Sequence, residues 1–391
     1  MIPITRPSLD EEEVTAAAAV IRSGWLSQGK RVDDFEQAVC AYVGAEHGIA
    51  VSNCTTALHL ALLAAGVRPG DEVICPSFSF IATANAILHA GAVPVFADID
   101  PRTYNIDAGA VETAISKRTR AIMPVDQIGL AADLRHLRDL ARAHRLAVVE
   151  DAAPSLGATF ESERVGSRSP LTCFSFHPRK SITTGEGGMI TTNDREVAGR
   201  LRRLRSHGAS ISDLDRHESD RVRFESYDEL GFNYRMTDIQ AAIGCVQIAK
   251  LERILAARSA AADRYSEMLA GDERLRLPYA PAGCRHTYQS YCVQLPSEDV
   301  RAVVMSELAS QGIATRRGVM AIHLEPLYRE RFPAYSLPIT ERASRETMLL
   351  PLYADMSEAE TETVVDALQR ALDKAFSSRY TRSLSGRGAR A

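Results

Sequence analysis

Several features of membrane proteins and nucleic-acid-binding proteins are missing from this sequence. No apolar run in its 391 residues approaches the ~18–20 residues that a membrane-spanning helix requires, and the first residues lack the charged-then-apolar layout of a secretion signal. Basic residues number 46 against 50 acidic ones, whereas proteins that bind nucleic acid usually carry a basic excess. We therefore expect a cytoplasmic protein that binds neither a membrane nor nucleic acid.

Cysteine pairs are missing as well. The seven cysteines are odd in number and scattered, and no two of them form a Cys-x-x-Cys pair. This pattern predicts neither a disulfide framework nor a zinc site, so we expect no metal. Most of the cysteines lie among apolar residues and are interpreted as small core side chains. Cys54 alone has a candidate local role.

Lysine is the scarcest of the basic residues, with five lysines against forty-one arginines. Lys180 lies between a short apolar run, Leu171–Phe176, and a glycine-rich turn, Gly185–Gly188. This placement is typical of a lysine that forms a Schiff base. The other four lie in polar or charge-flanked stretches, and we interpret them as solvated charges: Lys30, Lys117, Lys250 and Lys374.

The length predicts one large and one smaller domain, since 391 residues exceed one ordinary core. From about residue 48 to 192, short β-branched runs alternate with helical patterns, which predicts an α/β fold with a mostly parallel sheet covered by helices on both faces. The expected strands are Gly48–Val51, Glu72–Cys75, Val93–Ala97, Ala121–Pro124, Ala147–Glu150, Leu171–Phe176 and Gly188–Thr192. The expected helices are Thr55–Ala65, Ile81–His89, Ala108–Ile115 and Ala131–His144.

The second half of the chain predicts a loop, a long helix and a smaller α/β unit. Residues 206–229 are polar with little periodicity, which indicates a mobile loop. The later elements are expected at Thr237–Leu269 (helix), Ser290–Leu295 (strand), Ser297–Gln311 (helix) and Ser357–Phe376 (helix). We assign residues 1–245 to the large domain, whose N-terminal segment is allowed to pack on the small domain, residues 246–376 to the small domain, and residues 377–391 to a disordered tail.

A Schiff-base lysine suggests pyridoxal phosphate (PLP), which needs an anion site, a carboxylate for its pyridinium nitrogen and a flat partner for its ring. The segment Val51–Leu58 is a candidate anion site, because free N–H groups at a helix start attract oxyanions. The hydroxyls of Thr55 and Thr56 would add donors. Simple N-capping of that helix is the alternative.

Three further residues are candidates for the remaining roles. Asp151 ends an apolar strand and would face the ring nitrogen, and the alternative is an aspartate that caps a turn, which is common at strand ends. Glu150 beside it points to the opposite side of the strand. Phe80 is a candidate ring partner, with core packing as the alternative. Asn233 precedes a long helix, where it would bind an anion or merely mark the helix start.

Taken together, these segments resemble the DegT/StrS-type sugar aminotransferases. The segment Ser175–Met189, with Lys180 at its centre, is the most specific match, and the resemblance extends from about Pro7 to Gln369. It implies the three-layer fold-type-I PLP architecture with a smaller C-terminal α/β domain. The other matching segments are Asn53–Leu62, Pro69–Val73, Gly91–Asp100, Glu150–Ala153 and Gly231–Ala242.

The resemblance also implies a role for each matching residue. Lys180 would bind the cofactor covalently and carry the proton between cofactor and substrate. The cofactor-binding residues would be Asp151 at the ring nitrogen, Phe80 on the ring, Thr55, Thr56 and Ser175 at the phosphate, and Asn233 at the phosphate of the other subunit. That last role makes a homodimer with shared active sites the minimum active unit. His177 and His323 would line the sugar pocket.

Two positions depart from the family pattern. Cys54 stands where many relatives have glycine or alanine, which is tolerable where only its backbone is used. Pro154 stands where relatives often have histidine or glutamine, and its side chain has no donor for the cofactor's 3′ oxygen. Gln127 is a candidate substitute.

The sequence favours a PLP-dependent aminotransferase that transfers an amino group from an amino acid, L-glutamate first among them, to a keto-sugar carried on a nucleotide, such as a 4-keto-6-deoxy or 3-keto sugar. A ping-pong mechanism is expected. A keto-cyclitol acceptor is the alternative within enzymes. Lys180 argues against the related dehydrating branch, which has histidine there. A catalytically idle regulatory homologue is disfavoured, because Lys180 and Asp151 are both present.

Overall fold

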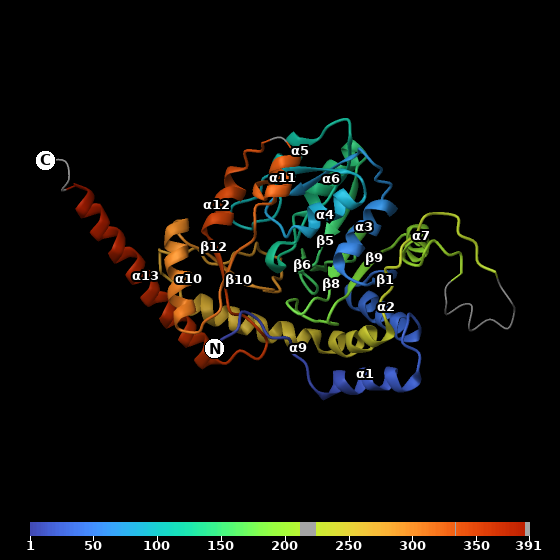
Figure 1. Cartoon of the computed structure of the whole chain (residues 1–391), viewed down its shortest axis with the longest axis horizontal. Helices are drawn as coiled ribbons and strands as arrows, with labels where there is room; N and C mark the ends of the chain where they lie inside the picture. The colour runs from blue at the N-terminus through green and yellow to red at the C-terminus, as the bar shows by residue number, and fades with distance from the viewer. Residues whose placement is uncertain (212–223, 333, 388–391) are drawn as a thin grey trace.

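A seven-stranded sheet forms the centre of the larger part of the molecule (Figure 1). The computed structural model describes residues 1–211, 224–332 and 334–387, with side chains as far as Ser377. The strand order is β1-β9-β8-β5-β4-β2-β3, and only β9 runs antiparallel to its neighbours. The strands are β1 (His47–Val51), β2 (Glu72–Pro76), β3 (Val93–Ala97), β4 (Thr119–Ile122), β5 (Ala147–Asp151), β8 (Leu171–Ser175) and β9 (Gly188–Thr192).

Helices cover both faces of this sheet, because successive side chains of a strand point to opposite faces and nearly all of them are buried. Val149 and Cys173 pack against one helical layer, whereas Val148 and Phe174 pack against the other. The first layer contains α3 (Cys54–Ala64), α4 (Ala82–His89) and α7 (Arg195–Arg205). The second contains α2 (Lys30–Val43), α5 (Ala108–Ala114), α6 (Leu134–His144) and α9 (Asp238–Met268). The predicted three-layer α/β fold with a mostly parallel sheet is therefore confirmed, and every predicted strand of it is present.

A smaller unit follows α9. Its sheet has the order β10-β12-β11, with every pair antiparallel. The N-terminal segment lies against it, since Ile2 pairs with Ile313 and the N–H of Leu352 donates to the carbonyl of Ile4 over 3.1 Å. Its elements are β10 (Tyr291–Gln294), α10 (Glu298–Ser310), β11 (Arg316–Arg317), η2 (Ile322–Leu324), α11 (Pro326–Arg331), α12 (Pro338–Glu346), β12 (Thr347–Leu350) and α13 (Glu358–Arg387). The proposed domain boundary at residue 245 falls inside α9 and stays a prediction.

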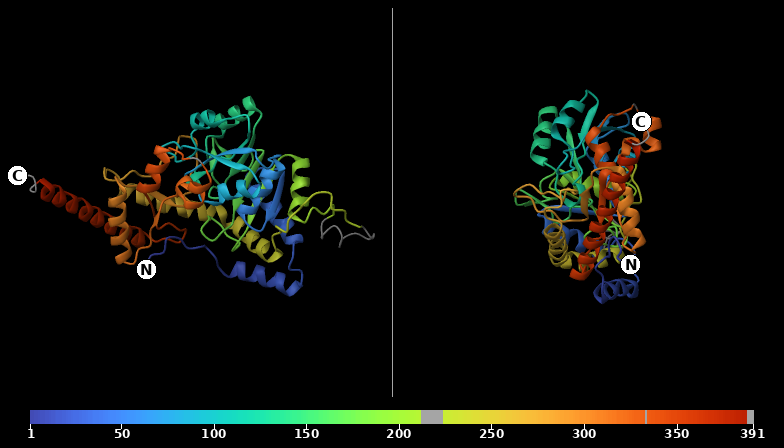
Figure 2. Two further views of the ribbon diagram at one scale, coloured as in Figure 1. Left: turned by 45° about the horizontal axis from the view of Figure 1, so that its top comes forward. Right: turned by 90° about the vertical axis from the view of Figure 1, so that its left-hand side faces the viewer.

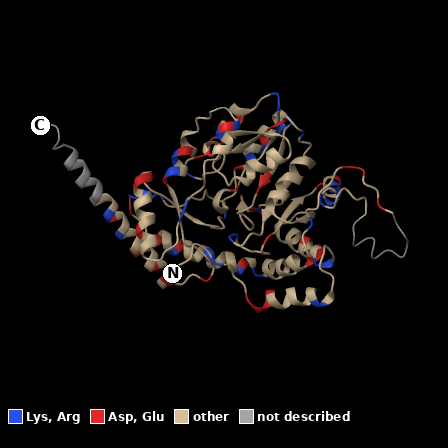
Figure 3. Ribbon diagram, in the orientation of Figure 1, with Lys and Arg blue, Asp and Glu red and all other residues tan. Residues whose placement is uncertain are grey.

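Several elements were not predicted from the sequence. The helix α1 (Glu11–Ser23) begins with a capping box between Asp10 and Glu13, a signal that the sequence did contain. Figure 3 shows acidic residues at the start of α1 and a basic one near its end, which suits the helix dipole. The other unpredicted elements are α2, α7, η1 (Gln127–Gly129), β6 (Thr159–Phe160) and β7 (Glu163–Arg164) in the large unit, and β11, η2, α11, α12 and β12 in the small unit.

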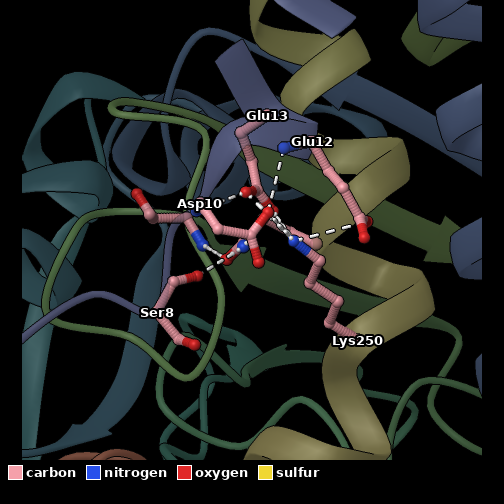
Figure 4. A network of polar contacts seen from close by, with 7 residues as sticks. Ser8, Asp10, Glu12, Glu13 and Lys250 are labelled. Carbon is pink, nitrogen blue, oxygen red and sulfur yellow. Dashed lines mark hydrogen bonds and ion pairs between the residues drawn. The ribbon is translucent and has the colours of Figure 1, made fainter. Parts of the chain in front are cut away.

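The expectation that Lys250 is a solvated charge is wrong. Its side chain is 9% exposed, and its Nζ atom donates to Asp10 Oδ1 over 2.8 Å and to Glu13 Oε1 over 2.9 Å (Figure 4). Glu12 lies 3.4 Å from the same amine. The acidic partners come from α1 and its cap, some 240 positions earlier in the chain, so the flanking residues of Lys250 gave no sign of them.

The expected tail is partly helical. The helix α13 runs to Arg387 instead of ending at Phe376, and Figures 1 and 2 show its last turns leading away from the body of the molecule. Residues 377–385 contain neither glycine nor proline, so a helix that is already packed as far as Ala375 propagates through them at little cost. Residues 388–391 lie outside the described residues, as does half of the predicted loop at 206–229, namely residues 212–223. Among the described helices, none combines the length and apolarity needed to cross a membrane.

Candidate active site

The candidate residues gather at one edge of the large sheet, where the carboxyl ends of β1, β2, β4, β5 and β8 meet. The strand register fixes their neighbours: Gly188 at the start of β9 pairs with both Val51 and Ser175, and Asp151 pairs with Cys173. The start of α3, the end of β8 and the end of β5 therefore lie in adjacent positions. This is the edge at which open α/β sheets usually bind ligands.

Asp151 is 5% exposed and faces the layer of α3 and α4. Its Oδ2 accepts a hydrogen bond of 2.7 Å from the hydroxyl of Thr83, and its Oδ1 accepts one of 3.2 Å from the N–H of Ala153. Burial raises the pKa of Asp151, whereas the bonds from Thr83 and Ala153 and the charge of Lys180 oppose the rise. The carboxyl is thus positioned by α4 as well as by its own strand.

Glu150 points to the opposite face, as predicted. Its Oε2 accepts a hydrogen bond of 2.8 Å from the hydroxyl of Thr172. Burial raises the pKa of Glu150, and burial together with Glu150 raises the pKa of the neighbouring Asp126. Of Asp126, Glu150 and Asp151, only Asp151 faces the α3–α4 layer.

Lys180 lies in the loop between β8 and β9, and its side chain is half-buried. Its N–H donates to the carbonyl of His177 over 2.8 Å, which closes a tight turn after β8. Burial lowers the pKa of Lys180, Cys54 and Asp151 act to raise it, and Arg179 lowers it further. The amine therefore lies within electrostatic reach of both Asp151 and the first residue of α3.

The start of α3 is both a helix cap and a candidate anion site. Asn53 caps the helix, since its Oδ1 accepts from the N–H of Thr56 over 3.0 Å while the Thr56 hydroxyl donates to the Asn53 carbonyl over 2.7 Å. The N–H groups of Cys54 and Thr55 and the Thr55 hydroxyl make no hydrogen bond with any described residue. Ser175, at the end of β8, is 8% exposed and completes the group. Thr56 therefore takes part in capping the helix, as the alternative predicted. The N–H groups of Cys54 and Thr55 and the Thr55 hydroxyl remain as donors for an anion.

Phe80 is a surface residue, not a core residue. Its side chain is 59% exposed, in the loop between β2 and α4, and its carbonyl accepts from the N–H of Thr83 over 3.1 Å. The same Thr83 holds Asp151, so the exposed ring and the buried carboxyl are joined through one residue. The core-packing alternative for Phe80 is therefore wrong.

The remaining predicted residues differ in their exposure. Asn233 is exposed and pairs with Ser206 through the backbone. His177 is half-buried, and its Nδ1 accepts from the N–H of Arg179 over 3.2 Å. His323 is 5% exposed, and its Nδ1 bonds the Ser77 hydroxyl over 2.7 Å. The side chain of His323 is thus enclosed, and a contact with a substrate would require its surroundings to open.

Pro154 and Gln127 both have hydrogen-bond partners within the chain. The carbonyl of Pro154 accepts from the hydroxyl of Thr287 over 3.2 Å. Gln127 is 4% exposed, and its side-chain amide donates to the carbonyl of Phe78. The candidate substitution of Gln127 for the missing donor at position 154 stays a prediction.

Sequence reasoning missed Thr83, which holds Asp151 and in turn bonds the hydroxyl of Ser79 over 2.8 Å. No local pattern in the sequence indicated Thr83, because its partner Asp151 lies 68 positions further along the chain. The described residues contain no cluster of histidine, cysteine and carboxylate side chains that could hold a metal ion.

The fold and this edge define an α/β enzyme that combines a half-buried lysine, a buried aspartate and a helix start with unused donors. The comparisons with known proteins then assign the family: residues 7–369 match the DegT/DnrJ/EryC1/StrS aminotransferase family, and the chain belongs to it. The chain is therefore an aminotransferase, and the resemblance seen in the sequence is confirmed.

Individual relatives match over almost their whole length. The GDP-perosamine synthase of Caulobacter vibrioides is 40% identical over 375 residues, which are 95% of this chain and 98% of that protein. The crystal structure of the aminotransferase TlmJ from Streptoalloteichus hindustanus has a TM-score of 0.88 at 34% identity, covering 96% of this chain and 99% of that one. NtdA from Bacillus subtilis, with bound cofactor PMP, has a TM-score of 0.83 at 30% identity, covering 93% and 82%.

Proposed function

We propose that this protein is a PLP-dependent aminotransferase that transfers an amino group from L-glutamate to a keto-sugar carried on a nucleotide. The observation that carries the proposal is Lys180, a half-buried lysine whose charge interacts with Asp151 and with the first residue of α3. The cofactor PMP in NtdA and the product in the name of GDP-perosamine synthase support the cofactor and the substrate class.

The residues at the sheet edge fit the cofactor on grounds of their own. The unused N–H groups of Cys54 and Thr55 suit a phosphate, and the exposed face of Phe80 suits a planar ring. Asp151 is a buried acceptor for a protonated ring nitrogen. PLP supplies the electron sink that lets a carbon–hydrogen bond next to nitrogen break.

The side chains of this chain would then bind, orient and move protons. The amino end of α3 and Ser175 hold the phosphate, and Phe80 covers one side of the ring. Asp151 keeps the proton on the ring nitrogen and is itself kept in place by Thr83. Lys180 would hold the cofactor covalently, and its amine would carry the proton between cofactor and substrate.

The assembly and the location are part of the proposal. Asn233 is exposed in the single chain, and the exposed apolar residues Phe224 and Leu230 lie close to it in sequence. A second copy that covered this surface would bring its Asn233 near a neighbouring phosphate site. We propose a homodimer with shared sites in the cytoplasm.

Covalent trapping tests the role of Lys180. Borohydride reduction after incubation with PLP should attach the cofactor to the peptide that contains Lys180, and Lys180→Ala should lose this mass shift and all amino transfer. Lys117→Ala is the matched control, because Lys117 is exposed and far from the sheet edge in sequence. Attachment at another lysine would contradict the proposed role.

Substrate trials test the reaction itself. In a ping-pong reaction, L-glutamate alone should give about one equivalent of 2-oxoglutarate per site before any acceptor is added. Nucleotide-linked 4-keto-6-deoxy and 3-keto sugars, with GDP as the first carrier, should then regenerate the enzyme. Turnover on a keto-cyclitol, without turnover on any nucleotide-linked sugar, would overturn the substrate class and leave the aminotransferase chemistry intact.

A further inference from the structure

Residues 285–289, here called the strap, connect the small unit to three loops of the large sheet just before β10 begins. The N–H of Arg285 donates to the carbonyl of Thr159 over 3.1 Å, in the loop after β5. The N–H of Thr287 donates to the carbonyl of Gly129 over 2.9 Å, in the loop after β4. The strap thus crosses the carboxyl edge that holds the candidate site.

Two contacts of the strap reach the backbone beside Asp151 and Lys180. The hydroxyl of Thr287, which is 2% exposed, bonds the carbonyl of Pro154 over 3.2 Å, three positions after Asp151. The side-chain amide of Gln289 donates to the carbonyl of Arg179 over 2.9 Å, one position before Lys180. Two hydrogen bonds from neighbouring residues therefore set the loop of the aspartate relative to the loop of the lysine.

The strap is held from beneath by Arg258, a residue of α9 that is 2% exposed. Its guanidinium donates to the carbonyl of Tyr288 from Nε over 3.1 Å and from Nη2 over 2.9 Å, and to the carbonyl of Gln289 over 2.6 Å. Among the described residues it has no carboxylate within ion-pair distance. Burying a charge whose described partners are all backbone carbonyls costs free energy. The hydrogen bonds that Arg258 donates to the strap offset part of this cost and hold the strap in one conformation.

Tyr288 adds a second sign of constraint. Its φ of 46° lies in the left-handed region, which non-glycine residues rarely adopt. The three bonds from Arg258 to the carbonyls of Tyr288 and Gln289 offset the cost of that turn. This backbone conformation places the side chain of Gln289 next to Arg179, whose carbonyl accepts its hydrogen bond.

We propose that Gln289 is a positioning residue for Lys180: its amide, fixed by Arg258 through the strap, holds the carbonyl of Arg179 and so the backbone from which Lys180 reaches the cofactor. The inference rests on the proposed function for its importance to catalysis. The contact itself is independent of any substrate.

Hydrogen exchange in the protein without cofactor tests the contact directly. Gln289→Met keeps the length of the side chain and removes the donor. The N–H of Lys180 bonds the carbonyl of His177 in the turn that Gln289 holds. This N–H should then exchange about five- to tenfold faster, because the turn has lost one hydrogen bond to the strap. The matched control is Gln294→Met, because Gln294 bonds Glu346 in the small unit instead of Arg179, and exchange at Lys180 should not change.

A second readout separates positioning from general stability. In the protein loaded with PLP, Gln289→Met should lower kcat about tenfold with little change in KM for L-glutamate, because the reacting groups are misplaced. It should also shift the pH midpoint of the visible absorption band. Arg258→Lys should do the same more weakly, whereas Arg264→Lys, on the same helix but bonded to the carbonyl of Met356, should not.

Unchanged exchange at Lys180 in Gln289→Met would overturn the proposal, and so would an equal change in both glutamine variants. Failure of amino transfer in the unsubstituted protein would contradict the proposed function alone, because the exchange measurement needs neither cofactor nor substrate.

Discussion

At the scale of single residues, Lys180 is half-buried and Lys250 is 9% exposed, and their surroundings shift the pKa of the two amines in opposite directions. Burial lowers the pKa of Lys180, and no acidic group within ion-pair distance compensates among the described residues. Burial also acts to lower the pKa of Lys250, but the hydrogen bonds that its amine donates to Asp10 and Glu13 outweigh burial and raise the pKa. Under the proposed function, the first amine would bind the cofactor, whereas the second joins α1 to α9.

The network of Figure 4 predicts that Lys250→Met destabilises the protein by about 3 kcal/mol, because it leaves the buried carboxylate of Glu13 without its cationic partner. Chemical denaturation at pH 7 measures this loss. Lys374→Met is the control, since Lys374 bonds Glu307 at the surface and should cost less than about 1 kcal/mol.

This loss should depend on pH. For Glu13, burial acts to raise the pKa, but hydrogen bonds from the N–H of Asp10, Gln247 and Lys250 lower it overall. The stabilisation that Glu13 gives the native protein is therefore present above its ordinary pKa and lost as the pH falls through its lowered value. In Lys250→Met the unpaired carboxyl gains a proton first, so the difference between the two proteins should narrow toward pH 4. A constant difference between pH 7 and pH 4 would show that Glu13 is not the group involved.

At the scale of elements, the contact between β9 and α3 shapes the candidate phosphate site. A Cβ atom on Gly188 would lie 2.6 Å from the backbone C and O of Asn53 and 2.8 Å from the N of Cys54. These are main-chain atoms at the helix start, so they cannot give way without moving the free N–H groups of α3.

Gly188→Ala should therefore weaken the binding of PLP about tenfold or more, while the binding of pyridoxal, which lacks the phosphate, changes little. Absorbance titrations with both compounds measure the two affinities. Gly199→Ala lies on α7, where a new Cβ atom would meet only the end of the Arg203 side chain at 3.8 Å, and should leave both affinities unchanged. Equal losses for both compounds would indicate a general disturbance of the site and not a phosphate effect.

Much of this element arrangement could be predicted from the sequence, because it depends on local patterns. The apolar run of β5 gave the strand, and its alternation gave Glu150 and Asp151 opposite faces. The strap could not be predicted, since Thr287 and Gln289 act on backbone carbonyls of distant loops, which carry no sequence signal. Lys250 was misread for the same reason.

At the scale of the whole molecule, the proposed homodimer can be tested by mixing two variants, each of which loses activity when it is alone. Lys180→Ala should be inactive, and Asn233→Ala should lose most activity because the neighbouring phosphate loses a donor. In the proposed dimer, each active site would take Lys180 from one chain and Asn233 from the other. Half of the sites in a mixed dimer are then intact, whereas neither variant alone contains an intact site.

Mixing the two variants after reversible dissociation should restore about a quarter of wild-type activity, since about half of the dimers are mixed and half of their sites are complete. Sedimentation of the unmixed protein checks that it is a dimer, and Leu230→Asp, which places a charge in the exposed apolar segment, should shift it toward the monomer. A dimer whose mixed variants regain no activity would place Asn233 at the phosphate of its own chain.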